Sequence, residues 1–204
     1  MGARAGRRPA GARLDSLGFL WPTTLSLHAH CAPEEAFDEC VAQVEAAVSW
    51  GLCPTHVDSH MGALQTHPAF FEVYVEVAAR LGLPLRMAGQ REPAAAAWAA
   101  GCRLRAARRG LAFTDDLALP ERAAAGEDAR TFLLRTVREL PDGVTEVFLH
   151  PAAAGPDLEA MTRHPAERVR DMDLLCDPPL RQAIADAGVE LVDYRSLRTR
   201  AATG

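Results

Sequence analysis

Segments of helical length alternate with short apolar runs along most of the chain. The longer segments carry apolar side chains every third or fourth position, and four of them stop just before a glycine, as amphipathic helices commonly do. The predicted helices are residues 33–50, 68–81, 94–109, 127–140 and 171–187. The proline pair Pro178–Pro179 near the middle of the last segment is expected to split it in two.

Short apolar runs that end in polar residues follow several of these helices and predict strands. They are residues 55–58, 84–87, 145–149 and 189–194. Helices that alternate with short strands favour an α/β fold with a parallel sheet, either open or closed into a (β/α) barrel. Residues 110–126 and 152–168 are expected to be loop-like insertions, and residues 1–32 do not fit the alternation.

Composition narrows the class of protein. The 204 residues are 49% hydrophobic, which suits a globular domain with a core, and the net charge of −5 makes nucleic acid an unlikely partner. Five cysteines without a CxxC pair predict buried free thiols and a cytoplasmic location. No apolar run approaches the roughly 20 residues that span a bilayer.

Three polar residues cluster where the first predicted strand ends. Strand alternation would place His56, Asp58 and His60 on one face if the strand continues through all three. The carboxyl ends of strands are where α/β folds build their sites, so this face can serve metal binding or acid–base chemistry. A solvated strand end explains the same residues about equally well.

His150 closes a second apolar run, directly before Pro151. Histidines that converge from different strand ends are how metal sites are assembled, although a lone histidine is more often structural. Other candidates carry less weight, because a structural role in a turn, at a helix cap or on the surface explains each of them at least as well as a functional role does. They are His28, His30, His67, Asp115, Asp116, His164 and Tyr194.

Three segments together resemble the YdjC/ChbG family of carbohydrate deacetylases: residues 54–64, 146–151 and 189–195. The resemblance covers about residues 19–198 and marks this range as a partial deacetylase domain. Residues 1–18 would then be an atypical, disordered extension and residues 199–204 a tail. The resemblance implies a cytoplasmic (β/α) barrel that removes acetyl groups from N-acetylated sugars, such as chitin-derived oligosaccharides.

The resemblance also implies the roles of individual residues. The two metal histidines of the family fall on His60 and His150, with His56 and Asp58 as catalytic residues in the same pocket. The implied cofactor is a divalent metal ion, Mg²⁺ by resemblance with Zn²⁺ as the alternative. Such an ion polarises an amide carbonyl and acidifies a bound water, while a carboxylate or an imidazole moves the proton.

One departure from the family bears on activity. Members open with a strand that ends in an Ala-Asp-Asp-like motif, and no such strand precedes Phe19. Either the start of the sequence has been placed too late, or the chain is truncated, in which case we expect an incomplete barrel whose uncovered edges favour marginal stability or self-association into a homo-oligomer. The alternative to a deacetylase is a non-catalytic truncated paralogue, a carbohydrate- or metal-binding remnant, and an unrelated α/β protein is a third.

Overall fold

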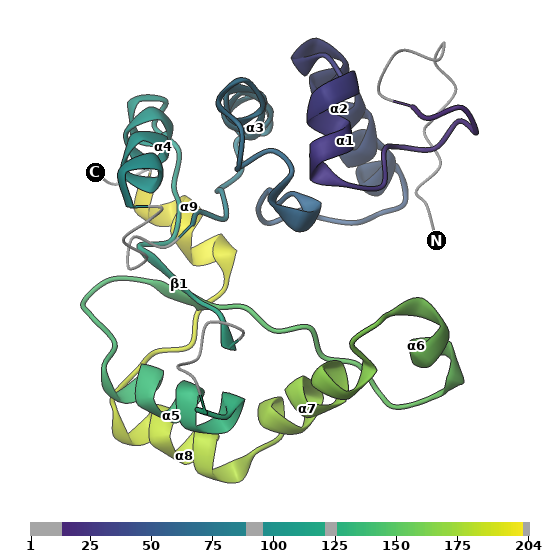
Figure 1. Ribbon diagram of the computed structural model, residues 1–204. Coiled ribbons are helices and arrows are strands. Elements are labelled where there is room, and N and C mark those ends of the chain that lie inside the picture. The colour runs from purple at the N-terminus through teal and green to yellow at the C-terminus, as the bar shows by residue number, and fades with distance from the viewer. Residues whose placement is uncertain (1–13, 89–95, 121–125, 202–204) are drawn as a thin grey trace. The chain divides into compact units, whose positions relative to one another are not determined.

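A computed structural model describes residues 14–88, 96–120 and 126–201 of the chain (Figure 1). The chain divides into two compact units. Unit 1 comprises residues 1–113 together with 193–204, and unit 2 comprises residues 114–192. Unit 1 is therefore built from two chain segments, and unit 2 is the sequence between them.

Unit 1 is mainly helical in its described residues. Its elements are α1 (Thr24–His30), α2 (Pro33–Ser49), the 3₁₀ turn η1 (His60–Gly62), α3 (Pro68–Leu81), α4 (Ala96–Arg108) and α9 (Tyr194–Ala201). The predictions for α2 and α3 are confirmed: both begin with proline in the first turn, and α3 ends at Leu81, directly before Gly82, whose φ of 60° is left-handed. The predicted helix 94–109 is confirmed from residue 96, and its first two residues lie outside the described ranges.

Unit 1 holds three extended segments that meet in parallel. Val57 bridges Leu85, and Leu85 bridges Phe113. The N–H of Val57 donates to the carbonyl of Pro84 at 2.8 Å, and the N–H of Arg86 donates back to the carbonyl of Val57 at 3.0 Å. The predicted strands 55–58 and 84–87 are thus present as single parallel bridges.

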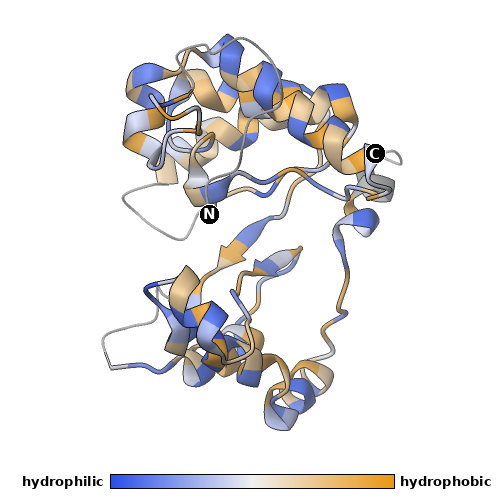
Figure 2. Ribbon diagram, turned by 90° about the vertical axis from the view of Figure 1, so that its right-hand side faces the viewer, coloured by the Kyte–Doolittle hydropathy of each residue, from blue (hydrophilic) through white to orange (hydrophobic). Residues whose placement is uncertain are grey.

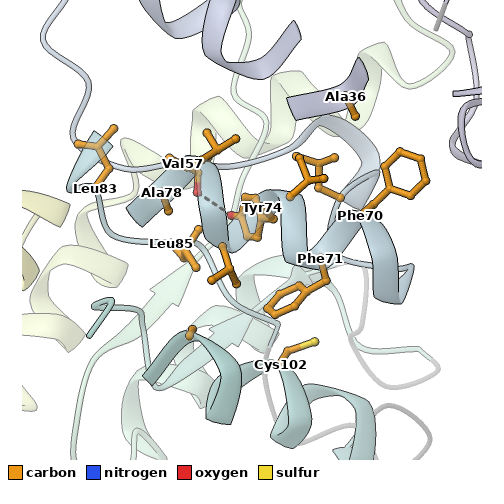
Figure 3. Packing of buried hydrophobic residues seen from close by; sticks show 14 of the residues in the cluster. Ala36, Val57, Phe70, Phe71, Tyr74, Ala78, Leu83, Leu85 and Cys102 are labelled. Carbon is orange, nitrogen blue, oxygen red and sulfur yellow. Dashed lines mark hydrogen bonds between the residues drawn. The ribbon is translucent and has the colours of Figure 1, made fainter. Parts of the chain in front are cut away.

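Helix α3 lies at the centre of the core of unit 1 and packs against both α2 and α4. Seven of its fourteen residues are buried, and Phe71 and Tyr74 are completely so (Figure 3). The hydroxyl of Tyr74 lies 2.6 Å from the carbonyl oxygen of Val57 and 3.0 Å from that of Arg86. This hydroxyl therefore ties the central helix to the two extended segments that carry the polar residues described below.

In its described residues, unit 2 pairs two short strands with four helices. Its elements are β1 (Asp116–Ala118), α5 (Ala129–Arg138), β2 (Thr145–Val147), α6 (Pro156–Met161), α7 (Pro165–Leu175) and α8 (Pro178–Asp186). Strands β1 and β2 are parallel, with Asp116 opposite Thr145. The core of this unit is apolar and joins α5 to α7 and α8 through Ala129, Phe132, Leu133, Val137, Leu174 and Leu180.

The fold is thus mixed α/β with a short parallel sheet, as predicted at that level, and closure into a barrel stays a prediction. Figure 2 shows hydrophilic and hydrophobic residues alternating around the helices, the amphipathic pattern from which α2, α3, α4, α5, α7 and α8 were predicted, whereas α1, α6 and α9 were not predicted. Within the described ranges, no helix is long and apolar enough to cross a membrane.

Several details of the sequence prediction are wrong. The segment 189–193 forms no strand, and Tyr194 instead begins α9. Apolar residues form a strand only where another strand pairs with them, and this segment has no such pairing in the described residues. The side chain of Leu191 is accordingly not covered, and 77% of the residue is exposed. The two segments expected to be loop-like, residues 110–126 and 152–168, contain β1 and α6. The predicted helix 171–187 is split as expected, but its first half, α7, begins at Pro165 and not at residue 171.

The predicted terminal segments are tested only in part. Residues 1–13 of the expected extension lie outside the described ranges, and Leu14 within it forms an antiparallel bridge with Leu20. The expected tail overlaps the end of α9, and its last three residues also lie outside.

Candidate functional site

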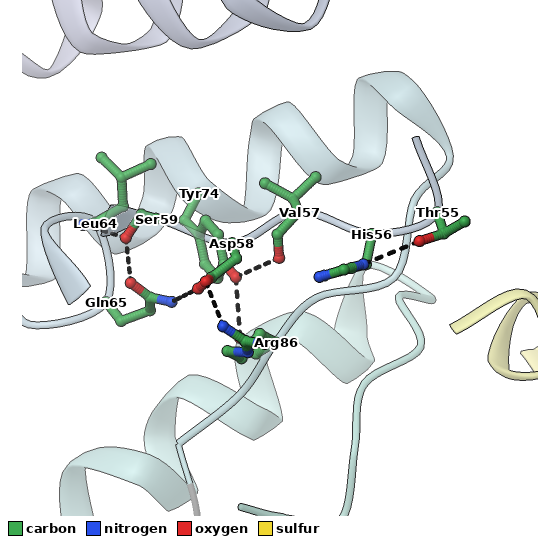
Figure 4. Close-up of polar contacts among 9 residues, drawn as sticks. All are labelled: Thr55, His56, Val57, Asp58, Ser59, Leu64, Gln65, Tyr74 and Arg86. Carbon is green, nitrogen blue, oxygen red and sulfur yellow. Dashed lines mark hydrogen bonds and ion pairs between the residues drawn. The ribbon is translucent and has the colours of Figure 1, made fainter. Parts of the chain in front are cut away.

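The polar cluster predicted at the first strand end lies on an extended segment of unit 1. Val57 is buried and held by the neighbouring segment, so the alternating side chains of His56 and Asp58 lie on the opposite face (Figure 4). The strand does not continue to His60, because the chain turns into η1 there and Met61 takes a φ of 55°. The predicted single face thus holds for two of the three residues.

Asp58 is held by two donors from different parts of unit 1. Arg86 Nη1 lies 2.5 Å from Asp58 Oδ2, and Gln65 Nε2 lies 3.1 Å from Asp58 Oδ1. Gln65 is itself hydrogen-bonded to the hydroxyl of Ser59, which also accepts from the N–H of Leu64 at 3.0 Å. The carboxylate therefore has a fixed orientation, while about a third of its side chain, 32%, is exposed to solvent.

His56 is held by its neighbour and by the C-terminal helix. Its Nδ1 lies 3.0 Å from the hydroxyl oxygen of Thr55, and its ring stacks on that of Tyr194 with centroids 3.9 Å apart. The two planes are 11° from parallel. The sequence left open whether Tyr194 reaches a site or lies on the surface, and the structure places it against a predicted catalytic residue.

His60 lies exposed at the start of η1, on a turn that α1 holds. His28 Nε2 donates to the carbonyl of Ala63 at 2.7 Å, and the hydroxyl of Thr24 donates to the carbonyl of Met61 at 3.4 Å. The sequence analysis left residues 1–32 outside the alternation of helices and strands, whereas His28 lies in α1 and fixes the turn that carries His60.

His150 follows β2 in unit 2 and is held through its backbone. Its N–H donates to Asp171 Oδ2 at 2.9 Å, and its ring packs edge-on against Phe148 with centroids 4.5 Å apart. Asp171 comes from α7 and was not identified from the sequence. A single aspartate on a helix carries no pattern, so only its burial, with 3% of the side chain exposed, singles it out.

The donor chemistry of the predicted metal ligands fits a divalent cation. Imidazoles suit Zn²⁺ and similar ions, and the carboxylate of Asp58, two residues from His60 in the sequence, is an oxygen donor of the kind that Mg²⁺ prefers. Among the described residues, no three His, Cys, Asp or Glu side chains are gathered into a ready-made metal centre. His60 belongs to unit 1 and His150 to unit 2, so their convergence on one ion stays a prediction.

Two further predictions from the sequence are wrong. The expected solvated or helix-capping pair is wrong for one residue: Asp115 is exposed, with its Oδ2 accepting from the N–H of Val144 at 2.8 Å, but Asp116 is only 6% exposed. Not all thiols are buried, since Cys53 and Cys176 are exposed. Burial does raise the pKa of the Cys40 and Cys102 thiols to about 11.

Comparison with known proteins gives one family. The model of that family, described as YdjC-like protein, matches residues 3–186. A carbohydrate deacetylase of Geobacillus stearothermophilus is 32% identical over 158 residues, which are 77% of this chain and 57% of the relative. A carbohydrate deacetylase of Vibrio cholerae serotype O1 (strain M66-2) is 33% identical over 168 residues, 81% of this chain and 59% of the relative. The chain thus spans less than three fifths of the length of these relatives.

A solved structure supports the fold. The crystal structure of a candidate cellobiose-phosphate cleavage protein from Enterococcus faecalis superimposes with a TM-score of 0.77. The match covers 90% of this chain and 68% of the other, at 22% sequence identity.

Proposed function

Because the chain belongs to the YdjC family, we propose that it is a metal-dependent hydrolase that removes acetyl groups from N-acetylated sugars or oligosaccharides. The carbohydrate deacetylases among its relatives support the reaction class. The observation that carries the proposal most directly is the fixed carboxylate of Asp58, held between Arg86 and Gln65 two residues before His60.

We propose His60 and His150 as the residues that hold a divalent cation, with Mg²⁺ favoured by the family and Zn²⁺ by the imidazole donors. When bound, the cation would polarise the amide carbonyl and lower the pKa of a water molecule. The imidazole of His60 is exposed, on a turn that α1 holds in place, so it is accessible to an ion. The backbone N–H of His150 is hydrogen-bonded to Asp171 on α7, which fixes the position of this residue.

Asp58 and His56 take two different roles in the proposed hydrolysis. In this reaction water adds to the amide carbon, the C–N bond breaks, and the departing nitrogen takes up a proton as acetate forms. Arg86 and Gln65 already donate to Asp58, so we assign this carboxylate to orienting the attacking water and balancing positive charge. We assign the proton transfer to His56, whose ring Tyr194 holds in place.

The alternative is a protein that binds a sugar or a metal ion without turnover. It follows from the partial coverage of the relatives, because about two fifths of their length has no counterpart in the alignment. Binding without release of acetate would distinguish this alternative from the enzyme.

Acetate release from N-acetylated chito-oligosaccharides tests the proposal. The chain is assayed after removal of metal and again with Mg²⁺, Mn²⁺ or Zn²⁺ added. We expect metal-dependent release that His60→Ala abolishes. His164→Ala is the matched control, because His164 is an exposed histidine at the start of α7 that pairs with Glu167 and should leave the rate unchanged. Absence of release with every metal, or full activity in His60→Ala, would refute the proposal.

The thiols support a reducing compartment, such as the cytoplasm, as the place of the reaction. Cys53 and Cys176 are exposed free thiols. Exposed thiols persist where the surroundings keep them reduced.

A further inference from the structure

A buried carboxylate lies behind the predicted metal ligand of unit 2. Asp171 is 2% exposed, and its two oxygens have one donor each: the N–H of His150 at 2.9 Å to Oδ2 and Arg170 Nη2 at 3.0 Å to Oδ1. A buried charge costs free energy unless donors compensate it. An apolar residue would fill the same space in α7 without that cost, so the carboxylate itself calls for an explanation.

The chain around His150 is held from both sides. After Pro151, the N–H of Ala152 donates to the carbonyl of Arg168 on α7 at 3.0 Å. Before His150, the N–H of Phe148 donates to the carbonyl of Ala118 on β1 at 3.0 Å. The bond from His150 to Asp171 lies between these two, and it is the one of the three made by a side chain.

We propose that Asp171 is a positioning residue for a cation ligand: its carboxylate fixes the backbone of His150, and its negative charge strengthens the binding of a divalent cation by that imidazole. The inference rests on the proposed function, in which His150 holds the cation. Groups behind a metal ligand typically change metal affinity by about 10- to 100-fold when they are removed.

Substitution of Arg170 tests whether the negative charge of Asp171 strengthens cation binding. Its guanidinium pairs with Asp171, but its side chain is 44% exposed, so solvent screens part of its charge, whereas the side chain of Asp171 is buried. Removing the arginine leaves the negative charge less compensated. A purely structural role predicts that loss of either partner weakens cation binding, whereas the proposed role predicts opposite effects of Arg170→Gln and Asp171→Asn.

The variants separate the hydrogen bond from the charge. Asp171→Asn keeps the shape and an oxygen that can accept from the His150 N–H but removes the charge, and Asp171→Ala removes both. Arg135→Gln is the control, because it breaks an ion pair in the same unit, with contacts of 2.8 and 2.9 Å between Arg135 on α5 and Glu127 just before that helix. Neither residue of this pair lies on α7 or near His150 in the sequence.

The experiment measures two properties of the full chain: amide hydrogen exchange at His150 and Ala152 by NMR, and calorimetric titration of the metal-free protein with Mg²⁺, Mn²⁺ and Zn²⁺. We expect Asp171→Ala to speed exchange at His150 and to weaken cation binding by about 10- to 100-fold. Asp171→Asn should keep most of the protection and bind more weakly by a smaller factor. Arg170→Gln should bind more tightly than the unmodified chain, and Arg135→Gln should bind equally.

The outcomes distinguish this inference from the proposed function. If the unmodified chain binds a cation and His150→Ala does not, but Asp171→Ala binds unchanged, the inference is wrong and the function stands. Equal weakening by Asp171→Asn and Arg170→Gln would also overturn it, in favour of a structural ion pair. If the unmodified chain binds none of the ions, the proposed function fails and the inference fails with it, even where exchange shows that Asp171 holds His150.

Discussion

The imidazole of His56 lies flat against the phenol ring of Tyr194, with ring centroids 3.9 Å apart. The two residues belong to the two separate chain segments that form unit 1. Tyr194 is the first residue of α9, so the point where the chain re-enters unit 1 is also the point where it contacts the polar cluster. The stack gives the C-terminal helix a direct part in the geometry of the proposed site.

Tyr194→Ala is expected to lower the rate of acetate release by roughly tenfold, because an aromatic pair contributes about 1 kcal/mol and the freed His56 ring would adopt other orientations. Tyr194→Phe keeps the ring and is expected to retain most of the rate. The rates are compared at saturating substrate. Equal losses in both variants would show that the stack is not what matters at this position.

Arg86→Gln removes the cation that orients Asp58 at 2.5 Å. We expect kcat to fall on the order of tenfold to a hundredfold, because a small displacement of an orienting group is costly in catalysis. Arg105→Gln is the matched control, since it breaks an ion pair with Glu72 in the same unit whose side chains are 49% and 60% exposed. An exposed pair of this kind contributes little to stability, so its loss should leave kcat unchanged. The account of Asp58 would be wrong if both variants kept full activity.

The start of α5 makes the stability of unit 2 depend on pH. Asp128 accepts hydrogen bonds from the backbone N–H and the hydroxyl of Thr131, and these hold the pKa of its carboxyl below the ordinary 3.8. A lowered folded-state pKa contributes stability above the ordinary value, and that contribution is lost as the pH falls through the folded value. Asp128→Ala should therefore unfold at a lower temperature than the unmodified chain at pH 7.

The difference in unfolding temperature between Asp128→Ala and the unmodified chain should shrink as the pH is lowered below 3.8. Thermal unfolding followed by circular dichroism between pH 7 and pH 2.5 measures it. A difference that stays constant over this range would contradict the role of the ionised carboxyl.

The cysteines should differ in reactivity according to burial. Burial raises the pKa of the Cys40 and Cys102 thiols to about 11, so few of these groups are thiolates at pH 8. Cys53 and Cys176 are exposed and should react first with iodoacetamide. Peptide mass spectrometry after timed labelling reads the order, and urea should abolish the difference. Early modification of Cys102 in the native protein would contradict its placement in the core.

Local patterns were sufficient to predict the long helices. Residues 33–50 and 68–81 carry their own start and stop signals, and α2 and α3 follow them to within a residue. The parallel α/β arrangement followed from the alternation of such helices with short apolar runs. Predictions of this kind need no knowledge of which segments meet.

The features that depend on distant partners could not be predicted. Residues 189–194 are as apolar and β-branched as a strand, but no ladder forms there in the described chain. Strand β1 was missed because its first residue is a buried aspartate. Asp171 and the contact of Tyr194 with His56 are tertiary features, so only the folded chain reveals them.

The most direct test of the central claim is a calorimetric titration of the metal-free chain with Mg²⁺, Mn²⁺ and Zn²⁺, run beside His60→Ala, His150→Ala and the double variant. If the two histidines hold one cation, the unmodified chain binds a single ion and each single variant loses that binding as completely as the double variant does. Binding that persists in either single variant, or no binding by the unmodified chain, would contradict the proposal that His60 and His150 form one metal site.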